Sequence, residues 1–341
     1  MRSKNIFLFV IVFLICVILA GCGSVDEKNG GNDKINNDGN SISNLKIVDV
    51  NSKSRPYAVM INNLAAARPF HSGLQDAYIV YEIIVEGGIT RLMALYKDKD
   101  TSRIGSIRSS RHYYLDYALE NDAIYVHFGW SPQAQSDISK LKINNINGLT
   151  YDGSTFFRDT SLGVDYEHTA FTSMDKLEER AKKLNYRTES NEDLLLNYSV
   201  KEINLNNEED SKIANEVKIK YSSYITSEYS YNSNDKLYYR SINGKKHSDY
   251  VTKKQYTTKN IIVAFMENSY IENDDKGRQE LDNIGTGDGY YITNGYAIPI
   301  KWSKSSRSAQ TVYTKLNGEE IDVNDGNTYI QIAPLNSLTI K

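Results

Sequence analysis

The chain has 341 residues and a formal net charge of −3 at pH 7, so it lacks the basic surplus expected of a nucleic-acid-binding protein. It has two cysteines, one of them inside the apolar N-terminal segment, which excludes a disulfide framework and a thiol-dependent enzyme. A length well above 200 residues favours two domains over one.

The first 21 residues have the three regions of a lipoprotein signal peptide. A short basic start precedes an apolar run, Ile6–Leu19, which at about 14 residues is shorter than the roughly 20 that span a bilayer. Two small residues then stand directly before Cys22, as cleavage and acylation of that cysteine require. We expect residues 1–21 to be removed and Cys22 to carry the palmitate-type lipid. An uncleaved membrane anchor is the alternative.

Residues 22–54 are predicted to be a disordered tether. The first part of this segment consists mainly of Gly, Asn, Asp, Ser and Lys, and it has almost no apolar side chains to bury. The sequence therefore predicts a folded part held close to the extracytoplasmic face of the cell membrane, with the membrane contacted only through the lipid on Cys22.

Residues 55–205 are predicted to form an α/β domain. Three apolar, β-branched segments are expected strands, and Gly87-Gly88 predicts a tight hairpin between the second and third. Ser131 and Pro132 are typical of a helix N-cap and first helical position. Strands interleaved with helices indicate an α/β sandwich. The expected elements are strands 56–63, 77–85 and 89–96, helix 112–120, strand 123–128 and helix 131–141.

The segment 147–171 is predicted to be a long loop that faces a ligand, because it combines turn residues with a cluster of charged side chains. Arg158 is the ligand-binding candidate in this loop. A helix is expected to follow up to about Asn185, with Thr172 as its N-cap and Asp175 completing a capping box.

Residues 214–341 are predicted to form a small all-β domain, so the whole chain is α+β. No helical period is visible, and many of the 26 tyrosines fall in short alternating segments. Gly285–Gly289 lacks the lysine of a P-loop and the strand-to-helix context of a dinucleotide site, and we expect a loop there. The dipeptides that predict hairpins are Asn243-Gly244, Asn294-Gly295, Asn317-Gly318 and Asp325-Gly326.

The leading candidate site is a group of arginines between residues 85 and 111. Guanidinium groups bind phosphate and carboxylate in a bidentate manner. Arg108 and Arg111 lie in a hydroxyl-rich turn before a predicted helix, whose N-terminus favours anions, and both are ligand candidates. Arg103 is expected to be solvated.

Arg91 is also a ligand candidate, but its position inside a predicted strand requires an acidic partner. Glu86 and Glu82, on the other side of the hairpin, are the two candidates for this partner. A purely structural role for these arginines, as ion pairs and solvated turn residues, is the alternative.

Four of the five histidines fall in the first half of the chain, without the spacing of a metal site. His127 ends a predicted buried strand, where open α/β sheets place functional groups, so it is a candidate for catalysis or ligand binding. His168 beside Glu167 is a candidate acid or base, whereas His71 and His112 are expected to be structural. No cofactor or metal is predicted.

Several motifs resemble those of the YerB-type family of bacterial lipoproteins, which is common in Gram-positive species. The resemblance extends from about residue 55 to the C-terminus and implies a two-domain lipoprotein, but no activity. Glu167 precedes His168 here, whereas the family tends to have a proline before this histidine. The motifs are Arg55–Asn63, Glu86–Arg91, Ile104–Arg111 and Tyr125–His127 with Gly129 and Ser131-Pro132 after it.

The sequence thus predicts a lipid-anchored protein of the cell envelope that binds an anionic cell-wall or lipid-linked ligand, or a partner protein. An enzyme acting on phosphoryl or glycosidic bonds is the alternative, with Glu86 or His127 as acid or base. Residues 90–111 are loosely similar to the LytR-CpsA-Psr enzymes, without their proline-arginine-aspartate motif. A scaffold for other envelope proteins is a third possibility.

Overall fold

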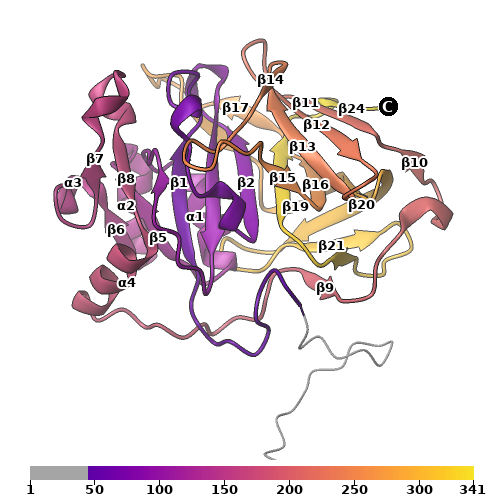
Figure 1. Ribbon diagram of the computed structural model, residues 1–341, viewed down its shortest axis with the longest axis horizontal. Helices are drawn as coiled ribbons and strands as arrows, with labels where there is room; N and C mark the ends of the chain where they lie inside the picture. Colours follow the sequence, from indigo (N-terminus) through magenta and orange to yellow (C-terminus); the bar gives the residue numbers. More distant parts are fainter. Residues whose placement is uncertain (1–44) are drawn as a thin grey trace, which may run out of the picture. The chain divides into compact units, whose positions relative to one another are not determined.

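The most continuous apolar segments of the chain become the middle of one large sheet. In β1, β2 and β3 every residue is buried, because both faces of these strands are covered. The computed structural model describes residues 45–341 (Figure 1). The expected signal peptide, Cys22 and most of the predicted tether lie outside this range. None of the helices within it is long and apolar enough to cross a membrane.

The first half of the described chain alternates strands and helices. Its elements are β1 (Tyr57–Asn62), β2 (Ile79–Ile84), β3 (Thr90–Tyr96), β4 (Ile104–Gly105), α1 (His112–Glu120), β5 (Ile124–His127), α2 (Pro132–Lys140), β6 (Asn145–Asn147), α3 (Gly148–Tyr151), β7 (Phe157–Arg158), β8 (Ala170–Thr172), α4 (Met174–Lys183) and β9 (Asn197–Ser199).

The second half consists of strands. They are β10 (Lys212–Ile213), β11 (Glu216–Lys220), β12 (Thr226–Asn232), β13 (Leu237–Ile242), β14 (Lys245–Lys246), β15 (Thr257–Thr258), β16 (Asn260–Phe265), β17 (Asn268–Tyr270), β18 (Gln279–Leu281), β19 (Gly285–Thr293), β20 (Tyr296–Lys304), β21 (Val312–Lys315), β22 (Asp322–Asn324), β23 (Thr328–Ala333) and β24 (Leu338–Ile340). The predicted α+β class is confirmed.

The large sheet has eleven strands and draws on both halves of the chain. Its order is β10-β20-β19-β16-β23-β2-β3-β1-β5-β6, with β21 beside β20. β23 lies between β2 and β16 and is parallel to both. The domain boundary that the sequence predicts near residues 205–214 therefore does not separate two sheets, because strands from both sides of it pair in this one sheet.

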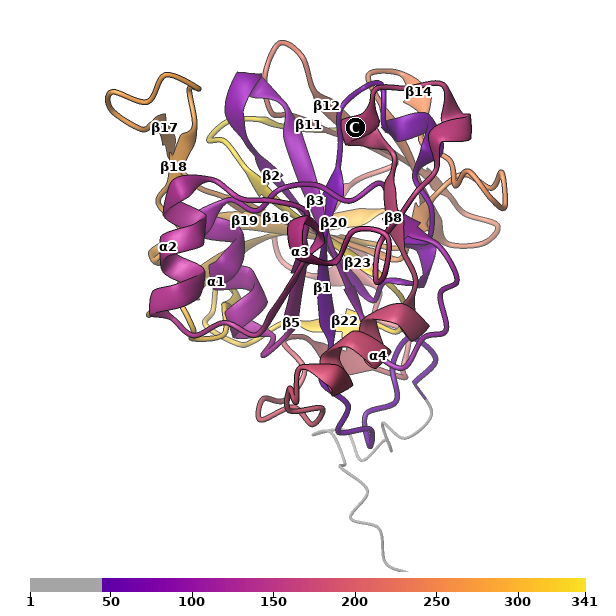
Figure 2. The same cartoon turned by 90° about the vertical axis from the view of Figure 1, so that its left-hand side faces the viewer.

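Each face of this sheet has its own hydrophobic core. On one face, α1 packs its tyrosines against inward-facing residues such as Met60 and Tyr81. On the other face, Val59 and Val80 pack with α4 and with the second sheet, whose order is β14-β13-β12-β11-β24 with β15 beside β13. Figure 2 shows α1 and α2 side by side, with strands of the large sheet behind them.

Several local predictions agree with the structure. β2 and β3 form the predicted antiparallel hairpin, and Gly87 and Gly88 in its turn have φ values of 69° and 68°. The Ser131 hydroxyl accepts a hydrogen bond from the Ala134 N–H at 3.3 Å, as expected for the N-cap of α2.

Four local predictions are wrong. The N-cap of α4 is Ser173, because Thr172 ends β8 and donates its hydroxyl to the Thr155 carbonyl oxygen at 2.7 Å. The segment 147–171 is more ordered than a loop, since it contains α3, β7 and the start of β8. Gly285–Gly289 begins strand β19. Asp325-Gly326 connects β22 and β23, which pair with other strands and not with each other.

Two fully buried ion pairs join the halves of the chain. Glu82 in β2 bonds the guanidinium of Arg240 in β13 at 2.9 Å, and Glu120 in α1 bonds the ammonium of Lys304 in β20 at 2.7 Å. All four side chains have no exposed surface. Thr90 and Ser227 also donate to the Glu82 carboxylate, at 2.7 and 2.8 Å. Such a pair is tolerated in a core only when its remaining hydrogen-bonding capacity is satisfied.

We expect Arg240→Ala to lower the free energy of unfolding by about 3 to 5 kcal/mol, because it leaves the Glu82 carboxylate buried without a counter-charge. Urea unfolding followed by circular dichroism measures this loss. The matched control is Lys301→Ala, which breaks an ion pair with Asp288 in which both side chains are more than half exposed. The control should lose no more than about 1 kcal/mol, and equal losses would contradict the account.

Candidate functional site

The hairpin between β2 and β3 places Glu86 beside two of the candidate arginines. The turn needs residues with positive φ after Glu86, and the two glycines supply them. Arg91 follows in β3, and Arg111 is the N-cap residue of α1. The fold therefore brings two of the candidate arginines, Arg91 and Arg111, to the same carboxylate.

The Glu86 carboxylate is held by both guanidinium groups. Arg91 Nη2 lies 2.9 Å from Glu86 Oε1, and Arg111 Nε lies 2.8 Å from Oε2, while Arg111 Nη2 also bonds Oε1. Arg91 Nη1 donates to the Ser109 carbonyl oxygen at 2.5 Å. Of the two partners predicted for Arg91, Glu86 is the one found.

The two arginines keep Glu86 ionised. Burial alone would raise the pKa of this carboxyl, but the hydrogen bond from Arg111 and the charges of Arg91 and Arg111 outweigh it and lower the pKa to about 2. Burial, together with the charge of Arg111, lowers the pKa of Arg91 to about 10. A carboxylate in this state is a poor general acid at neutral pH.

Arg108 and Arg158 do not contact Glu86. Both hold the short turn at residues 166–168. Arg108 Nη2 pairs with Glu167 Oε2 at 2.9 Å, and Arg158 Nη1 donates to the Tyr166 carbonyl oxygen at 2.9 Å. Arg158 also pairs with the Asp152 carboxylate at 3.0 Å. Two predicted ligand residues, Arg158 within the segment 147–171 and Arg108 in the turn before α1, therefore both fix this segment through contacts inside the protein.

Arg103 is not solvated, contrary to the prediction. Its guanidinium pairs with Asp159 at 2.8 Å and lies 3.8 Å from the centre of the Phe171 ring. The side chain is only 17% exposed. The stacking partner is 68 residues away in the chain, and no local pattern indicates it.

His127 is fully buried at the end of β5. Its ring nitrogens contact the Gly129 carbonyl oxygen at 2.7 Å and the Asn145 side-chain oxygen at 3.1 Å. Burial lowers the pKa of this imidazole to about 4, although both hydrogen bonds oppose the shift. The ring therefore lies inside the protein, with both nitrogens used in internal hydrogen bonds.

The other histidines take part in internal contacts. His168 Nδ1 lies 2.8 Å from the Asn62 side-chain amide, and His112 Nε2 lies 2.8 Å from the Glu280 carboxylate. His71 bonds His247 in the second half of the chain at 2.8 Å, and burial lowers the pKa of His71 to about 3. Within residues 45–341, no group of three or more His, Cys, Asp or Glu side chains is arranged to hold a metal ion.

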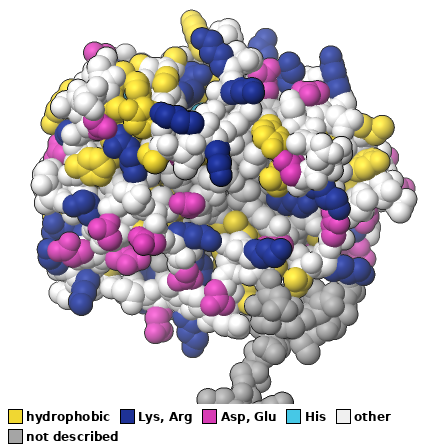
Figure 3. All heavy atoms as spheres, viewed as in Figure 1, with side chains coloured by type: hydrophobic (Ala, Val, Ile, Leu, Met, Phe, Trp, Pro, Cys, Tyr) yellow, Lys and Arg dark blue, Asp and Glu magenta, His cyan; other side chains and the backbone are white. Residues whose placement is uncertain are grey.

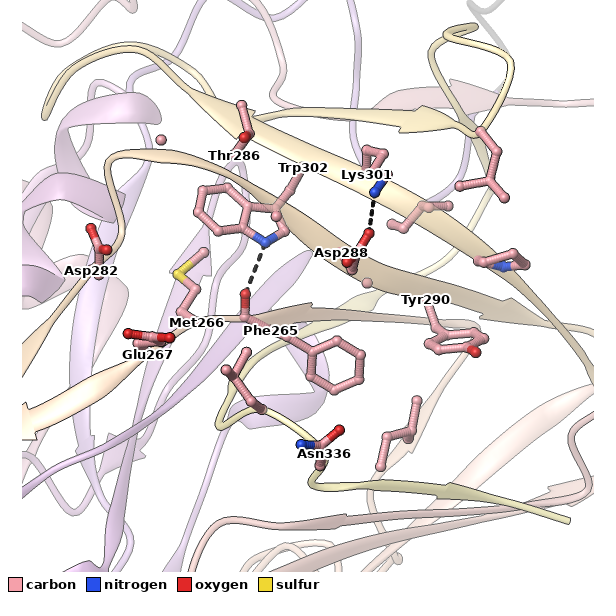
Figure 4. Close-up of a pocket in the computed structure, with 18 of the residues that line it drawn as sticks. Phe265, Met266, Glu267, Asp282, Thr286, Asp288, Tyr290, Lys301, Trp302 and Asn336 are labelled. Carbon is pink, nitrogen blue, oxygen red and sulfur yellow. Dashed lines mark hydrogen bonds and ion pairs between the residues drawn. The ribbon is translucent and has the colours of Figure 1, made fainter.

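Sequence reasoning did not identify a groove of about 980 Å³ beside β19 and β20 (Figure 4). The Trp302 indole N–H donates to the Phe265 carbonyl oxygen at 3.0 Å, and Lys301 pairs with Asp288 at its rim. Gly287 leaves space for the indole, since a Cβ atom there would lie 2.5 Å from its nitrogen. The sequence feature that could have indicated this groove is the alternation of Gly and polar residues in 285–289.

Comparison with known proteins identifies the family. The family model described as "Protein of unknown function (DUF3048) N-terminal domain" matches residues 42–187, and the corresponding C-terminal domain model matches residues 217–330. The chain is 30% identical over 310 residues to the Bacillus subtilis (strain 168) protein named "Putative lipoprotein YerB", covering 86% of this chain and 85% of that one.

A solved structure shows the same fold. The crystal structure of YerB protein from Bacillus subtilis superimposes with a TM-score of 0.75 at 29% identity, over 86% of this chain and 98% of that one. The resemblance to YerB-type lipoproteins that the sequence motifs indicate is therefore confirmed.

The lowered pKa of Glu86 predicts a specific pH dependence of stability. Because the pKa of Glu86 in the folded state lies below its ordinary value of 4.5, the stabilisation is complete above about pH 4.5 and is lost as the pH falls towards 2. Glu86→Gln should remove up to about 3 kcal/mol of unfolding free energy at pH 7 and much less near pH 2. Urea midpoints measured from pH 2 to 7 test this, and a pH-independent difference between the two proteins would contradict it.

Proposed function

Because the chain belongs to the DUF3048 family and its named relative is a lipoprotein, we propose that it is an extracytoplasmic lipoprotein that binds an anionic ligand of the cell envelope. The anchor is the lipid on Cys22, supported by the apolar segment and the small residues before that cysteine. The ligand is an anionic cell-wall polymer or a lipid-linked glycan.

The observation that carries the binding proposal is an excess of guanidinium groups over carboxylates in what we call the arginine turn, which consists of Arg91, Arg108 and Arg111 with their acidic partners. Within residues 45–341, the ion pairs of Arg91, Arg108 and Arg111 involve two acids, Glu86 and Glu167. The pairing therefore leaves one positive charge. Among the described residues, the buried Nε of Arg108 has no hydrogen-bonding partner.

Glu167 is the carboxylate that an incoming anion would replace. Its side chain is 52% exposed, so its ion pair with Arg108 is of the weak surface type. Glu86 is only 23% exposed and is held by two arginines, which makes it a positioning group that remains in place. A phosphate or carboxylate of the ligand would take the position of the Glu167 carboxylate on Arg108.

Binding fits this geometry better than catalysis. Glu86 is kept charged by Arg91 and Arg111, and His127 has no exposed surface. A general acid or base must reach the proton that it transfers. We therefore propose a binding protein and not an enzyme acting on phosphoryl or glycosidic bonds.

The double variant Arg108→Ala, Arg111→Ala should bind purified Gram-positive wall fragments that carry anionic polymers at least about tenfold more weakly than the unaltered protein, because charge-assisted hydrogen bonds are lost. The full chain in nonionic detergent is titrated with labelled fragments. The control Arg180→Ala, Arg278→Ala removes the same charge from α4 and from the turn after β17. Unchanged affinity in the first variant, with an intact circular dichroism spectrum, would refute the arginine turn as the site.

The anchor is tested separately. Cys22→Ala should prevent acylation, so that membrane-bound protein is lost and unprocessed or released protein accumulates. Cell fractionation and mass spectrometry of the N-terminal peptide measure both effects. A wild-type N-terminal peptide that begins at Met1 and carries no lipid would contradict the proposed anchor.

A further inference from the structure

A second cationic surface lies where the two halves of the chain meet. A pocket of about 430 Å³ is lined by residues of the segment that follows β1 and by residues of β14 and the turn after it. This volume is within the range of small-molecule sites in proteins, about 300 to 1,000 Å³. β14 is at the top of Figure 1, and the upper part of the same view carries several Lys and Arg side chains in Figure 3.

Four cations line this pocket: Arg68, Lys245, Lys246 and Lys253. Within residues 45–341, none of them forms an ion pair. This distinguishes the pocket from the arginine turn, where Arg91, Arg108 and Arg111 each have a carboxylate partner. Lys245 and Lys246 are exposed at the end of the β13–β14 hairpin.

Arg68 supplies the most restrained of the four charges. Its side chain is partly buried, and its Nε donates to the Asn63 carbonyl oxygen at 3.1 Å. Neither of its terminal nitrogens has a partner among the described residues. Both nitrogens therefore remain available for an anion, in the planar arrangement that suits phosphate.

An aromatic side chain positions the fourth cation. The Lys253 ammonium lies 4.0 Å from the centre of the Tyr250 ring, at cation–π distance. Tyr250 is in turn held by the Phe70 ring, 5.5 Å away, and by a hydrogen bond from its N–H to the His71 carbonyl oxygen at 2.7 Å. Residues of both halves thus fix this wall of the pocket.

The single acid in the lining is occupied by internal hydrogen bonds. Asp249 accepts from the N–H groups of Gly73, Val251 and Thr252 and from the Tyr256 hydroxyl, at 2.8 to 3.0 Å. It therefore remains a charged structural group and does not pair with the cations. Four positive groups against one negative group give the lining a net charge of +3.

One residue of the lining, His247, is held by buried hydrogen bonds. His247 accepts a hydrogen bond from Arg240 Nε at its Nδ1, at 3.1 Å. Since Arg can only donate, Nε2 of the neutral His247 carries the proton and donates to His71 Nδ1 at 2.8 Å. His247 is therefore held by the same buried network that contains the Glu82–Arg240 ion pair.

We propose that this pocket binds a phosphate-bearing anion with more than one negative charge. Lysine ammonium groups bind phosphate as point charges and arginine binds it with a planar pair of donors, and both types converge here. The volume exceeds what a single phosphate needs, so a pyrophosphate or a phosphorylated headgroup fits the lining. The site is separate from the arginine turn, and its existence does not depend on the function proposed for that turn.

The test is a calorimetric titration of the full chain, in nonionic detergent, with inorganic pyrophosphate and with dihexanoyl phosphatidic acid, a lipid whose phosphomonoester headgroup can carry two negative charges. If only pyrophosphate binds, the ligand is a soluble phosphorylated molecule. If the lipid binds more strongly, the ligand is a lipid headgroup. Either result supports the proposal when the double variant Lys245→Ala, Lys246→Ala binds that probe at least about tenfold more weakly than the unaltered protein. Arg68→Gln should have an effect of similar size, because it removes the planar donor pair.

The control variant is Lys140→Ala, Lys182→Ala, which removes two exposed lysines that also form no ion pair within residues 45–341. It should bind both probes as the unaltered protein does. Failure of both probes to bind, or equal weakening in the control, would overturn the proposal. Pyrophosphate binding that is lost in Arg108→Ala, Arg111→Ala and retained in the lysine variant would place the anion at the arginine turn and would also overturn it.

Discussion

The buried ion pair between Glu82 and Arg240 is the constraint on which the rest of the structure depends. Glu82 lies in the middle of β2, a strand whose other residues are apolar or tyrosine. An unpaired carboxylate there would cost several kcal/mol, so β2 can occupy the centre of the sheet only when β13 supplies the guanidinium. The first half of the chain therefore requires the second half for its own core.

The sheet topology follows the same requirement. β23 is inserted between β2 and β16, and Glu120 reaches across to Lys304 in a second fully buried pair. These interior charges have structural roles, since each is matched by a partner. The charges that we propose for ligands are less buried: Arg108 in the arginine turn, and the exposed lysines in the pocket at β14. At that pocket Arg68, from the first half, lies with lysines of the second.

Local patterns predicted the parts of the fold that depend on neighbouring residues. The β2–β3 hairpin follows from its glycine pair, the start of α2 follows from Ser131, and the Arg91–Glu86 pair follows from the hairpin itself. The place of β23 in the sheet could not be predicted, because a parallel strand has no local signal that identifies its partners.

The same limit applies to the candidate site. Glu82 in an apolar strand indicates that a cation must lie nearby, but Arg240 is 158 residues away and nothing in its own segment marks it. The partners of Arg103 and Arg108 are likewise set by the path of the loop between α2 and α4. The pocket at β14 was not predicted, because Lys245 and Lys246 in a hairpin are typical of any solvated turn.

The central claim is that this fold places unpaired cations from both halves of the chain in one anion site. The most direct measurement is a crystal structure of the full chain grown with pyrophosphate. The account predicts electron density for the anion between Arg68 and the β14 lysines, with Asp249 still bonded to its backbone donors. An empty pocket at saturating pyrophosphate, or an anion bound only at Arg108, would contradict it.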